Sequence, residues 1–451
     1  MLTFNKKINM KNIYNKISYI GIAAVMMLFA SCTFDEQVDP NGPSVDGVES
    51  NATIGQLNEL VVGVEASARN GIAIETTASG TMARELYLFD ADPRNTGDLL
   101  GKNGIGLDNN SFYSTSQWNG SYRCIKNANL LINAATNSNA VSDEERRGYI
   151  GFAKTMIAYE LIQMVKSYDR ARVDVADENN LGPVLEKDEA LAEIRTMLNE
   201  ANTDLTGATF LFNLSAGFNG FNDASSFAQY NRAVAAMAAV YAGDGGAAIT
   251  ALGDSYFDLM GDLNNGPKHL FATGGNDALN GLFKLQSTTV ENQNNGDQII
   301  VHDSWINDAE PGDTRVANKA ALRPDPTASQ DDLVGAYETR LYASSTSPID
   351  ILRNEELILL YAEASMLNSS PGDAVTALNV IRNAAGLPNY TGGLDDASLT
   401  TELLNQRRYS LWCENHRMFD LRRFGLSNTL PIDRAGDVIY NTLPIPLSEN
   451  E

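Results

Sequence analysis

The sequence predicts a mainly α-helical fold, in which tetratricopeptide-like helical hairpins form an α-α superhelix with a loop-rich irregular region and a few short strands. The first indication is a stripe in residues 148–168, where apolar side chains recur three and four positions apart. The stripe consists of Ile150, Ala153, Ile157, Leu161 and Met164. The second indication is the alanine content of residues 226–244 and 355–367, because small side chains let packed helices approach closely.

A third indication is a repeated sequence after each alanine-rich segment. GGAAITAL at residues 245–252 resembles PGDAVTAL at residues 371–378, and each follows a short turn that contains glycine. This echo predicts a helix–turn–helix unit that is used at least twice. The second copy should end near Gly386, which is a natural C-terminal cap, and Pro388 should prevent its continuation.

Two regions lack helical periodicity. Residues 80–117 and 262–350 are rich in Gly, Asn, Asp, Thr and Ser. Residues 281–290 and 337–345 alternate apolar and polar side chains and are predicted to form short strands. Long irregular segments on a rigid frame often carry binding surfaces. We therefore expect a helical scaffold over about residues 51–260 and 350–425, and a ligand-binding region over about residues 262–350.

The N-terminus has the layout of a secretory signal. Residues 1–31 contain four lysines and no acidic residue. The apolar run at residues 17–30 is shorter than the about 20 residues of a membrane-spanning helix. Met1 and Met10 both fit as the start of such a signal, and a buried N-terminal helix is the competing interpretation.

The sequence Leu28-Phe29-Ala30-Ser31-Cys32 resembles the bacterial lipoprotein box, where a signal is cut before a cysteine whose sulfur takes a diacylglycerol. We therefore expect residues 1–31 to be a signal peptide and Cys32 to be lipidated. Several acyl chains would anchor the protein durably, since each buried CH₂ contributes about 0.8 kcal/mol. Residues 32–50 are polar and aperiodic, which is typical of a tether. Within them, Asp35 and Glu36 resemble the acidic export signal of Bacteroidetes surface lipoproteins.

Composition and motifs argue against several functions. The net charge of −24 makes nucleic acid an improbable partner, because binding it requires a basic face. His269, His302 and His416 lie in separate segments, and the sequence contains no H-E-x-x-H, G-x-S-x-G or P-loop motif. We therefore expect no enzyme activity, no metal site and no cofactor. Carboxylates are abundant, so a glycoside hydrolase is kept as an alternative.

Cys124 and Cys413 are the two cysteines that follow the lipoprotein box. They could form a disulfide in an exported protein, but the sequence does not show that they meet. Two buried thiols are the favoured interpretation, because free cysteine packs as a small hydrophobic residue.

Charged and apolar side chains alternate densely in residues 405–425. On a single helix, Glu414, Arg417, Asp420 and Arg423 would lie three residues apart and could pair with one another. One interpretation is a charge cluster that binds ligand. The favoured interpretation is a structural network that locks this helix against its neighbours, because buried charges are costly unless they are paired.

This segment resembles the C-terminal motif E-G-x-R-W-x-D-L-x-R of the SusD/RagB outer-membrane lipoproteins of Bacteroidetes. Asn415 and Met418 stand where that family often has Gly and Trp. Upstream, Arg353, Glu356 and Glu363 match the family's R-x-x-E-x-x-L-x-x-A-E-A helix, and Arg382 and Gly386 match its L-N-x-x-R-x-x-A-G-L segment. Similarities at residues 118–132, 312–315 and 444–449 extend the resemblance along the chain.

The resemblance implies a SusD-like domain over residues 51–451, whose helical repeats support an irregular half that holds the ligand. It implies a lipid-anchored, surface-exposed protein of the outer membrane that caps a SusC-like TonB-dependent transporter. It also implies that the protein captures oligosaccharide nutrients for import and performs no chemistry on them. The alternative is a helical-repeat surface protein that binds a protein or peptide partner.

Glycan binding would require aromatic rings for the apolar sugar faces and polar side chains for the hydroxyls. Trp305 is the first candidate, because it lies in a polar irregular stretch beside Asp303, Asn307 and Asp308. Tyr87 and Phe89 are the second candidates. Trp305 could instead anchor its loop to the core. Trp118 and Trp412 lie in motif-like helical segments and are expected to be core residues.

Overall fold

The computed structural model describes residues 45–275, 277–293 and 296–449. The chain divides into two compact units, residues 1–48 and 49–451, and the architecture below is that of the second unit. Helix α2 (Val45–Asn51) begins in the first unit and ends in the second. The predicted signal peptide, Cys32 and the first part of the tether lie outside the described residues.

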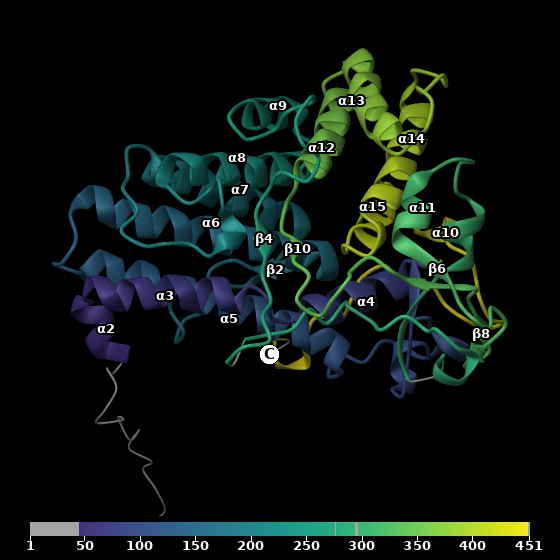
Figure 1. Cartoon of the computed structure of the whole chain (residues 1–451). Helices are drawn as coiled ribbons and strands as arrows, with labels where there is room; N and C mark the ends of the chain where they lie inside the picture. Colours follow the sequence, from purple (N-terminus) through teal and green to yellow (C-terminus); the bar gives the residue numbers. More distant parts are fainter. Residues whose placement is uncertain (1–44, 276, 294–295, 450–451) are drawn as a thin grey trace, which may run out of the picture. The chain divides into compact units, whose positions relative to one another are not determined.

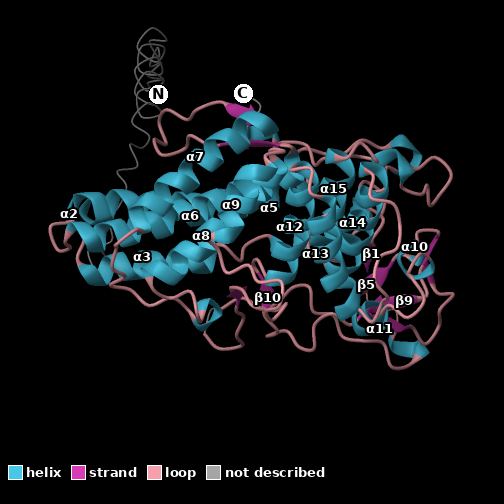
Figure 2. Cartoon of the chain, turned by 90° about the horizontal axis from the view of Figure 1, so that it is seen from above, coloured by secondary structure: helices cyan, strands magenta, loops and turns pink. Residues whose placement is uncertain are grey.

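Stacked antiparallel helices form the frame of the second unit (Figures 1 and 2). Helix α3 packs on α5, and from α5 each helix of the frame packs on the next, with α9 against α12 where the irregular region intervenes. The helices are α3 (Ile54–Ser67), α4 (Ile72–Met82), α5 (Phe112–Asn137), α6 (Asp143–Tyr168), α7 (Lys187–Leu205), α8 (Ala224–Tyr241), α9 (Gly245–Gly253), α12 (Asn354–Leu367), α13 (Pro371–Ala384), α14 (Asp396–Ser410) and α15 (Arg417–Arg423). The prediction of a mainly α-helical fold is confirmed.

Capping residues set where the long helices begin. In α6 the backbone N–H of Ser142 donates to the Glu145 carboxylate (2.7 Å), while the Ser142 hydroxyl accepts from the Glu145 N–H (3.3 Å). Thr53 and Gln56 form the same reciprocal pair at the start of α3. The capping box explains why α6 begins at Asp143, a few residues before the apolar stripe of residues 148–168.

The two predicted hairpins are α8–α9 and α12–α13. Gly245, the first residue of α9, lies directly against α12. A β-carbon at Gly245 would lie 2.6 Å from the backbone oxygen of Ala364, which is closer than a side chain tolerates. Gly386 has φ of +77°, just after α13 ends at Ala384, so it takes the left-handed conformation expected of a C-terminal cap.

The irregular half contains a four-stranded antiparallel sheet of order β1-β5-β9-β6. Its strands are β1 (Leu86–Asp90), β5 (Asp297–Val301), β9 (Tyr337–Thr339) and β6 (Ala320–Leu322). Three short antiparallel ladders pair β2 (Arg170–Arg172) with β3 (Val184–Glu186), β4 (Lys268–His269) with β10 (Ile349–Asp350), and β7 (Ser329–Gln330) with β8 (Leu333–Val334). The short helices α10 (Asp303–Asn307) and α11 (Thr314–Lys319) follow β5.

The predicted strand at residues 337–345 is confirmed only for β9, and the prediction of a strand at residues 281–290 is wrong. In the latter segment, the N–H of Ser287 donates to the carboxylate of Glu338 on β9 (2.6 Å) instead of joining a backbone ladder. Leu285 and Val290 remain exposed. Alternation of apolar and polar residues alone therefore does not produce a strand here.

The core continues from the helices into the irregular half. One face of the sheet packs on Trp305, Tyr409 and Trp412. Trp118 is 2% exposed and Trp412 is 0% exposed, which confirms both as core residues. Cys124 and Cys413 are free, buried thiols. No helix among the described residues is long and apolar enough to cross a bilayer.

Candidate functional site

Trp305 is fully buried, with 0% of its surface exposed. Its ring centroid lies 5.1 Å from that of Tyr409 and 5.2 Å from that of Trp412. Its indole N–H donates to the backbone oxygen of Arg408 (3.2 Å). The prediction that Trp305 stacks on a ligand is therefore wrong, because no ring surface is left for a sugar. Trp305 instead anchors α10 to α14.

Tyr87 and Phe89 on β1 are also unavailable to a ligand. Each is 3% exposed, and both pack in a core cluster with Leu100, Ile300 and Leu333. Their rings stack on each other at a centroid distance of 5.9 Å. The prediction of ligand contacts fails for both residues because the sheet and the following loop cover them.

The polar residues beside Trp305 lie on α10 and directly after it, without an accessible aromatic partner there. Asp303 accepts a hydrogen bond from the N–H of Ala336 (3.2 Å), and Asp308 pairs with Arg408 (2.9 Å). Asn307 is exposed. Ligand contacts of these three residues remain a prediction, but the ring of Trp305 is not available beside them to stack on a sugar.

The charged residues predicted to lie on one helix are separated by a break in the helix before Arg417. Helix α14 ends at Ser410 and α15 begins only at Arg417, with left-handed turns at Cys413 (φ +62°) and Asn415 (φ +56°) between them. Glu414 therefore lies outside the helix, where it pairs with Arg353 instead of Arg417. The predicted Glu414–Arg417 pair is wrong, whereas the pair of Asp420 and Arg423 is present (2.9 Å).

Asp420 is the centre of a buried charge network. It is 2% exposed and accepts from Arg407 on α14 (2.6 Å) and from Arg423 on α15 (2.9 Å). Arg423 also donates to Glu363 on α12 (2.7 Å). Burial by itself would raise the pKa of Asp420, but Arg407 and Arg423 hold that pKa below its ordinary value. The network joins three helices.

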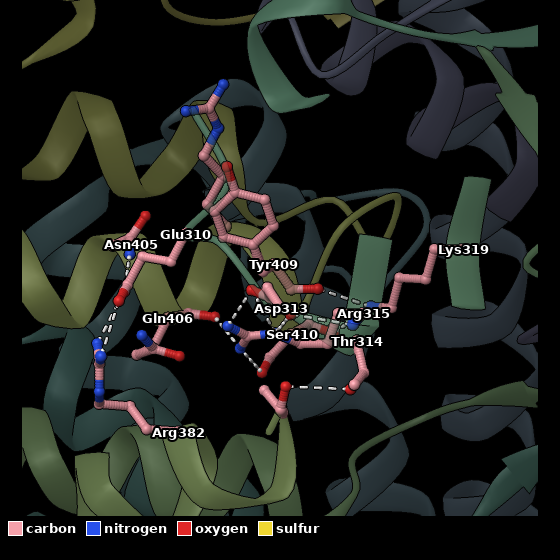
Figure 3. A network of polar contacts seen from close by, with 12 residues as sticks. Glu310, Asp313, Thr314, Arg315, Lys319, Arg382, Asn405, Gln406, Tyr409 and Ser410 are labelled. Atoms are coloured by element: carbon pink, nitrogen blue, oxygen red, sulfur yellow. Dashed lines mark hydrogen bonds and ion pairs between the residues drawn. The ribbon is translucent and has the colours of Figure 1, made fainter. Parts of the chain in front are cut away.

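A second network attaches the irregular half to α13 and α14 (Figure 3). Arg382 donates to both carboxylate oxygens of Glu310 (2.8 and 2.7 Å) and to Glu402 on α14 (2.6 Å). The amide of Asn405 donates to the same Glu310 carboxylate (3.2 Å). Glu310 precedes α11, so these bonds fix the entry of α11 onto the helical frame.

Helix α11 is fixed to the C-terminus of α14 by two more cations (Figure 3). Arg315 pairs with Asp313 (2.7 Å) and donates to the Ser410 hydroxyl (3.0 Å). Lys319 donates to the backbone oxygens of Tyr409 (2.9 Å) and Ser410 (2.6 Å), which belong to the unsatisfied end of a helix. These contacts support the structural interpretation of the charged motifs.

A small polar chamber lies inside the frame. Its volume is about 60 Å³, which is room for a few waters and too little for a sugar. It is lined by the buried groups Glu75, Glu160, Lys166, Glu356 and His416. Burial raises the pKa of Glu75 and of Glu356 to about 7 and that of Glu160 to about 8.

A larger groove of about 460 Å³ lies outside the chamber, and Ala68 and His269 line both. Three segments and Met156 of α6 form the groove. The segments are the second half of α3 with the residues after it, the stretch before α8, and the stretch that begins at β4. Its lining includes Val62, Glu65, Ala66, Arg69, Leu214, Phe218, Phe271 and Asp277. This volume is within the range of small-molecule sites.

Arg69 is the principal cation of the groove. Its guanidinium pairs with Asp277 (2.6 Å) and lies 5.9 Å from the ring centroid of Phe271. Four residues before Arg69, Glu65 lies on α3, and its carboxylate accepts from the N–H of Ser215 (3.2 Å). Burial raises the pKa of Glu65, and its hydrogen bonds to Ser215 oppose that rise. The groove therefore combines an apolar lining with hydrogen-bonding groups.

The groove could not be located from the sequence because its walls are far apart along the chain. No short motif marks Arg69, Leu214 or Phe271, and all three come together only through packing of α3 on the irregular half. Throughout the part of the chain that the structure describes, no Trp, Tyr or Phe is openly exposed. The same residues contain no group of His, Cys, Asp or Glu side chains placed to hold a metal ion.

Stacked helical hairpins with a docked irregular half define the class of this protein as a tetratricopeptide-like scaffold. Residues 335–442 match the sequence model of the SusD family. Surface glycan-binding protein A from Bacteroides thetaiotaomicron, in complex with laminarihexaose, has 16% identity and a TM-score of 0.68, with 88% of this chain and 97% of that chain covered. The resemblance to the SusD/RagB family is therefore confirmed, and the chain has the SusD fold.

Other solved structures agree. A SusD superfamily protein from Bacteroides vulgatus has 16% identity and a TM-score of 0.65, with 88% of this chain and 96% of that chain covered. A SusD-like protein from Bacteroides fragilis has 14% identity and a TM-score of 0.65, with 93% and 98% covered. No curated protein sequence matches the chain. At these identities the solved structures establish the fold.

Proposed function

We propose that this protein is a non-enzymatic surface lipoprotein that binds oligosaccharides and delivers them to a SusC-like TonB-dependent transporter. The observation that carries the proposal is the agreement of the family match at residues 335–442 with the fold of the whole described unit. One protein of this fold was solved with a bound glucan, laminarihexaose. The lipoprotein box and acidic tether add the expected location on the outer membrane.

The groove beside α3 is the proposed glycan site. Its apolar lining could contact sugar C–H faces, while Arg69, Asp277 and Glu65 offer charged partners for hydroxyl groups. Residues 268–272 and Asp277 belong to the region in which sequence analysis expects the ligand. The remaining walls lie outside that region and come from α3 with the residues after it, from Met156 on α6 and from residues 213–218.

Filling the groove should weaken glycan binding. Ala66 is an exposed residue on the α3 wall, so Ala66→Trp adds an indole to the groove without removing a buried contact. Ile54→Trp is the matched control, because Ile54 is exposed on the same helix and does not line the groove. In isothermal titration against a panel of oligosaccharides, Ala66→Trp should weaken binding at least about tenfold, while Ile54→Trp keeps the native affinity.

Three outcomes of that titration would change the proposal. Equal affinity of native protein and Ala66→Trp would place the sugar elsewhere, for example near Asn307 and Asp308 at the end of α10. Release of shortened sugars would contradict the non-enzymatic role and favour a glycoside hydrolase. Binding of peptides with no binding of any sugar would favour the alternative of a protein- or peptide-binding surface protein.

The proposed anchor is a lipid on Cys32. Cys32→Ala should leave the folded domain unchanged and release or mislocalise the protein, because the thiol that takes the diacylglycerol is lost. Fractionation of membranes and circular dichroism of the purified variant measure the two effects. Retention of the folded variant on the outer membrane would contradict lipid anchoring at this residue.

The proposed transporter partner distinguishes the main proposal from the alternative. Under the main proposal, a large TonB-dependent barrel protein should co-purify with the native lipoprotein from detergent-solubilised membranes. A surface protein with an unrelated protein partner would instead bring down that partner without the barrel.

A further inference from the structure

A pocket of about 290 Å³ lies between α14, α15 and the single-turn helix Ser427–Thr429. Its lining includes Thr401, Glu402 and Arg408 from α14, Arg417 and Leu421 from α15, and Thr429. It shares no lining residue with the glycan groove or with the polar chamber. Two arginines, Arg408 and Arg417, line this pocket, whereas the groove and the chamber have one each.

Arg417 is a half-buried cation without a bonded partner. Its side chain makes no hydrogen bond or ion pair among residues 45–275, 277–293 and 296–449. Burial, and then the like charge of Arg408, lower the pKa of Arg417 to about 10. The guanidinium remains charged at neutral pH, so the pocket contains a positive charge that the fold does not neutralise directly.

The carboxylates nearest to this pocket are already paired. Glu402 accepts from Arg382 (2.6 Å) and Gln406 (2.8 Å). Asp420 is occupied by Arg407 and Arg423, and Asp308 by Arg408. None of these groups is within ion-pair distance of Arg417.

Glu85 and Asp420 are the acids whose attraction opposes the lowering of the Arg417 pKa. Asp420 is already paired, and Glu85 is a poor partner. It is 2% exposed, and one of its carboxyl oxygens has no hydrogen-bond partner within the described structure. Burial raises the pKa of Glu85 to about 8, so its carboxyl is mostly protonated at neutral pH. Glu85 is therefore a weak counter-charge for Arg417.

We propose that the Arg417 pocket binds the carboxylate of a small acidic ligand about the size of one sugar acid. A guanidinium presents parallel N–H donors that match a carboxylate. Arg408, which also pairs with Asp308, lies on the same wall. Thr401 and Thr429 place hydroxyl groups on the wall for the rest of the ligand. The overall charge of −24 does not prevent binding, because charges farther than about 8–10 Å are screened at physiological salt.

Titration of the folded protein with glucuronate tests this site, with glucose as the uncharged probe of similar size. Glucuronate should bind, glucose should not bind at the same concentration, and added salt should weaken the glucuronate complex. Arg417→Gln should weaken glucuronate binding at least about tenfold. Arg123→Gln is the matched control, because it removes the same charge from an exposed position on α5 and should leave the affinity unchanged.

Absence of glucuronate binding to the native protein would overturn the proposal, and so would equal binding of glucose. An equal loss of glucuronate affinity in Arg417→Gln and Arg123→Gln would also overturn it. Tighter binding of inorganic phosphate than of glucuronate would overturn the assignment to carboxylates. If Arg417→Gln does not fold, Thr401→Phe takes its place, since it narrows the pocket and leaves Arg417 intact. Unchanged affinity in folded Thr401→Phe would also overturn the proposal. Ala66→Trp should not affect glucuronate, which separates this site from the groove.

Discussion

Replacing Asp420 by asparagine should lower the free energy of unfolding by about 3–5 kcal/mol. The reason is that Arg407, 1% exposed, would lose its carboxylate partner while it remains buried. Glu363 would still accept from Arg423, but no other carboxylate pairs with Arg407 among the described residues. Urea unfolding followed by circular dichroism measures the change.

Asp169→Asn is the matched control on the other side of α15. Asp169 pairs with Arg422 at 3.2 Å, and its side chain is 37% exposed, so its loss should cost about 1 kcal/mol or less. A similar loss in both variants would contradict the special role of the buried network. Because the folded pKa of Asp420 is depressed, its stabilisation is present above its unfolded pKa of about 4 and is lost as pH falls through the lower folded value.

Glu160 should make stability depend on pH in the direction opposite to Asp420, and replacing Glu160 by glutamine should remove this dependence. Burial raises the pKa of Glu160 to about 8, while in the unfolded chain it ionises near pH 4.3. Between these values the unfolded state has lost a proton that the folded state retains. Native stability should therefore fall as pH rises through this window, by up to about 1.4 kcal/mol per pH unit.

Glutamine has nearly the shape of the protonated acid and does not titrate, so Glu160→Gln should gain stability relative to the native protein as pH rises from 5 to 8. Urea unfolding at a series of pH values measures this divergence. Glu193→Gln, at an exposed position on α7, should keep the native pH profile. Parallel profiles for the native protein and Glu160→Gln would contradict a raised pKa in the folded chamber.

The helical frame could be predicted because its signals are local. Apolar spacing identifies α6, and the echo of residues 245–252 and 371–378 identifies the second helices of two hairpins. The lipoprotein box is equally local, although it lies outside the described residues. Such patterns can be interpreted without knowing which residues pack against the segment.

Burial in the irregular half could not be predicted in the same way. Trp305 is surrounded in sequence by polar residues, but its partners Tyr409 and Trp412 lie about a hundred residues later in the chain. The polar neighbours occupy the outside of a short helix, α10, while the indole is on its inside. A polar context therefore describes the exposed side of α10 and not the tryptophan.

The break before α15 had a signal in the sequence. Asn415 stands where related proteins often have Gly, and it adopts the left-handed conformation that glycine and asparagine tolerate best. A position of this kind is incompatible with a continuous helix from Glu414 to Arg417. The left-handed residue therefore separates Arg417 from Glu414.

The register of the sheet determines when in synthesis and refolding the irregular half can form. Leu86 on β1 pairs with Val301 on β5, and β5 pairs with β9 at Tyr337, so the sheet is complete only after most of the chain is present. Closing a loop of roughly 200 residues carries an entropic cost before any ladder bond forms. Local hairpins can form sooner, so we expect folding to proceed from the helices to the sheet. Until then, β1 is an unpaired strand rich in apolar residues, and the newly synthesised chain is most prone to aggregate at that segment.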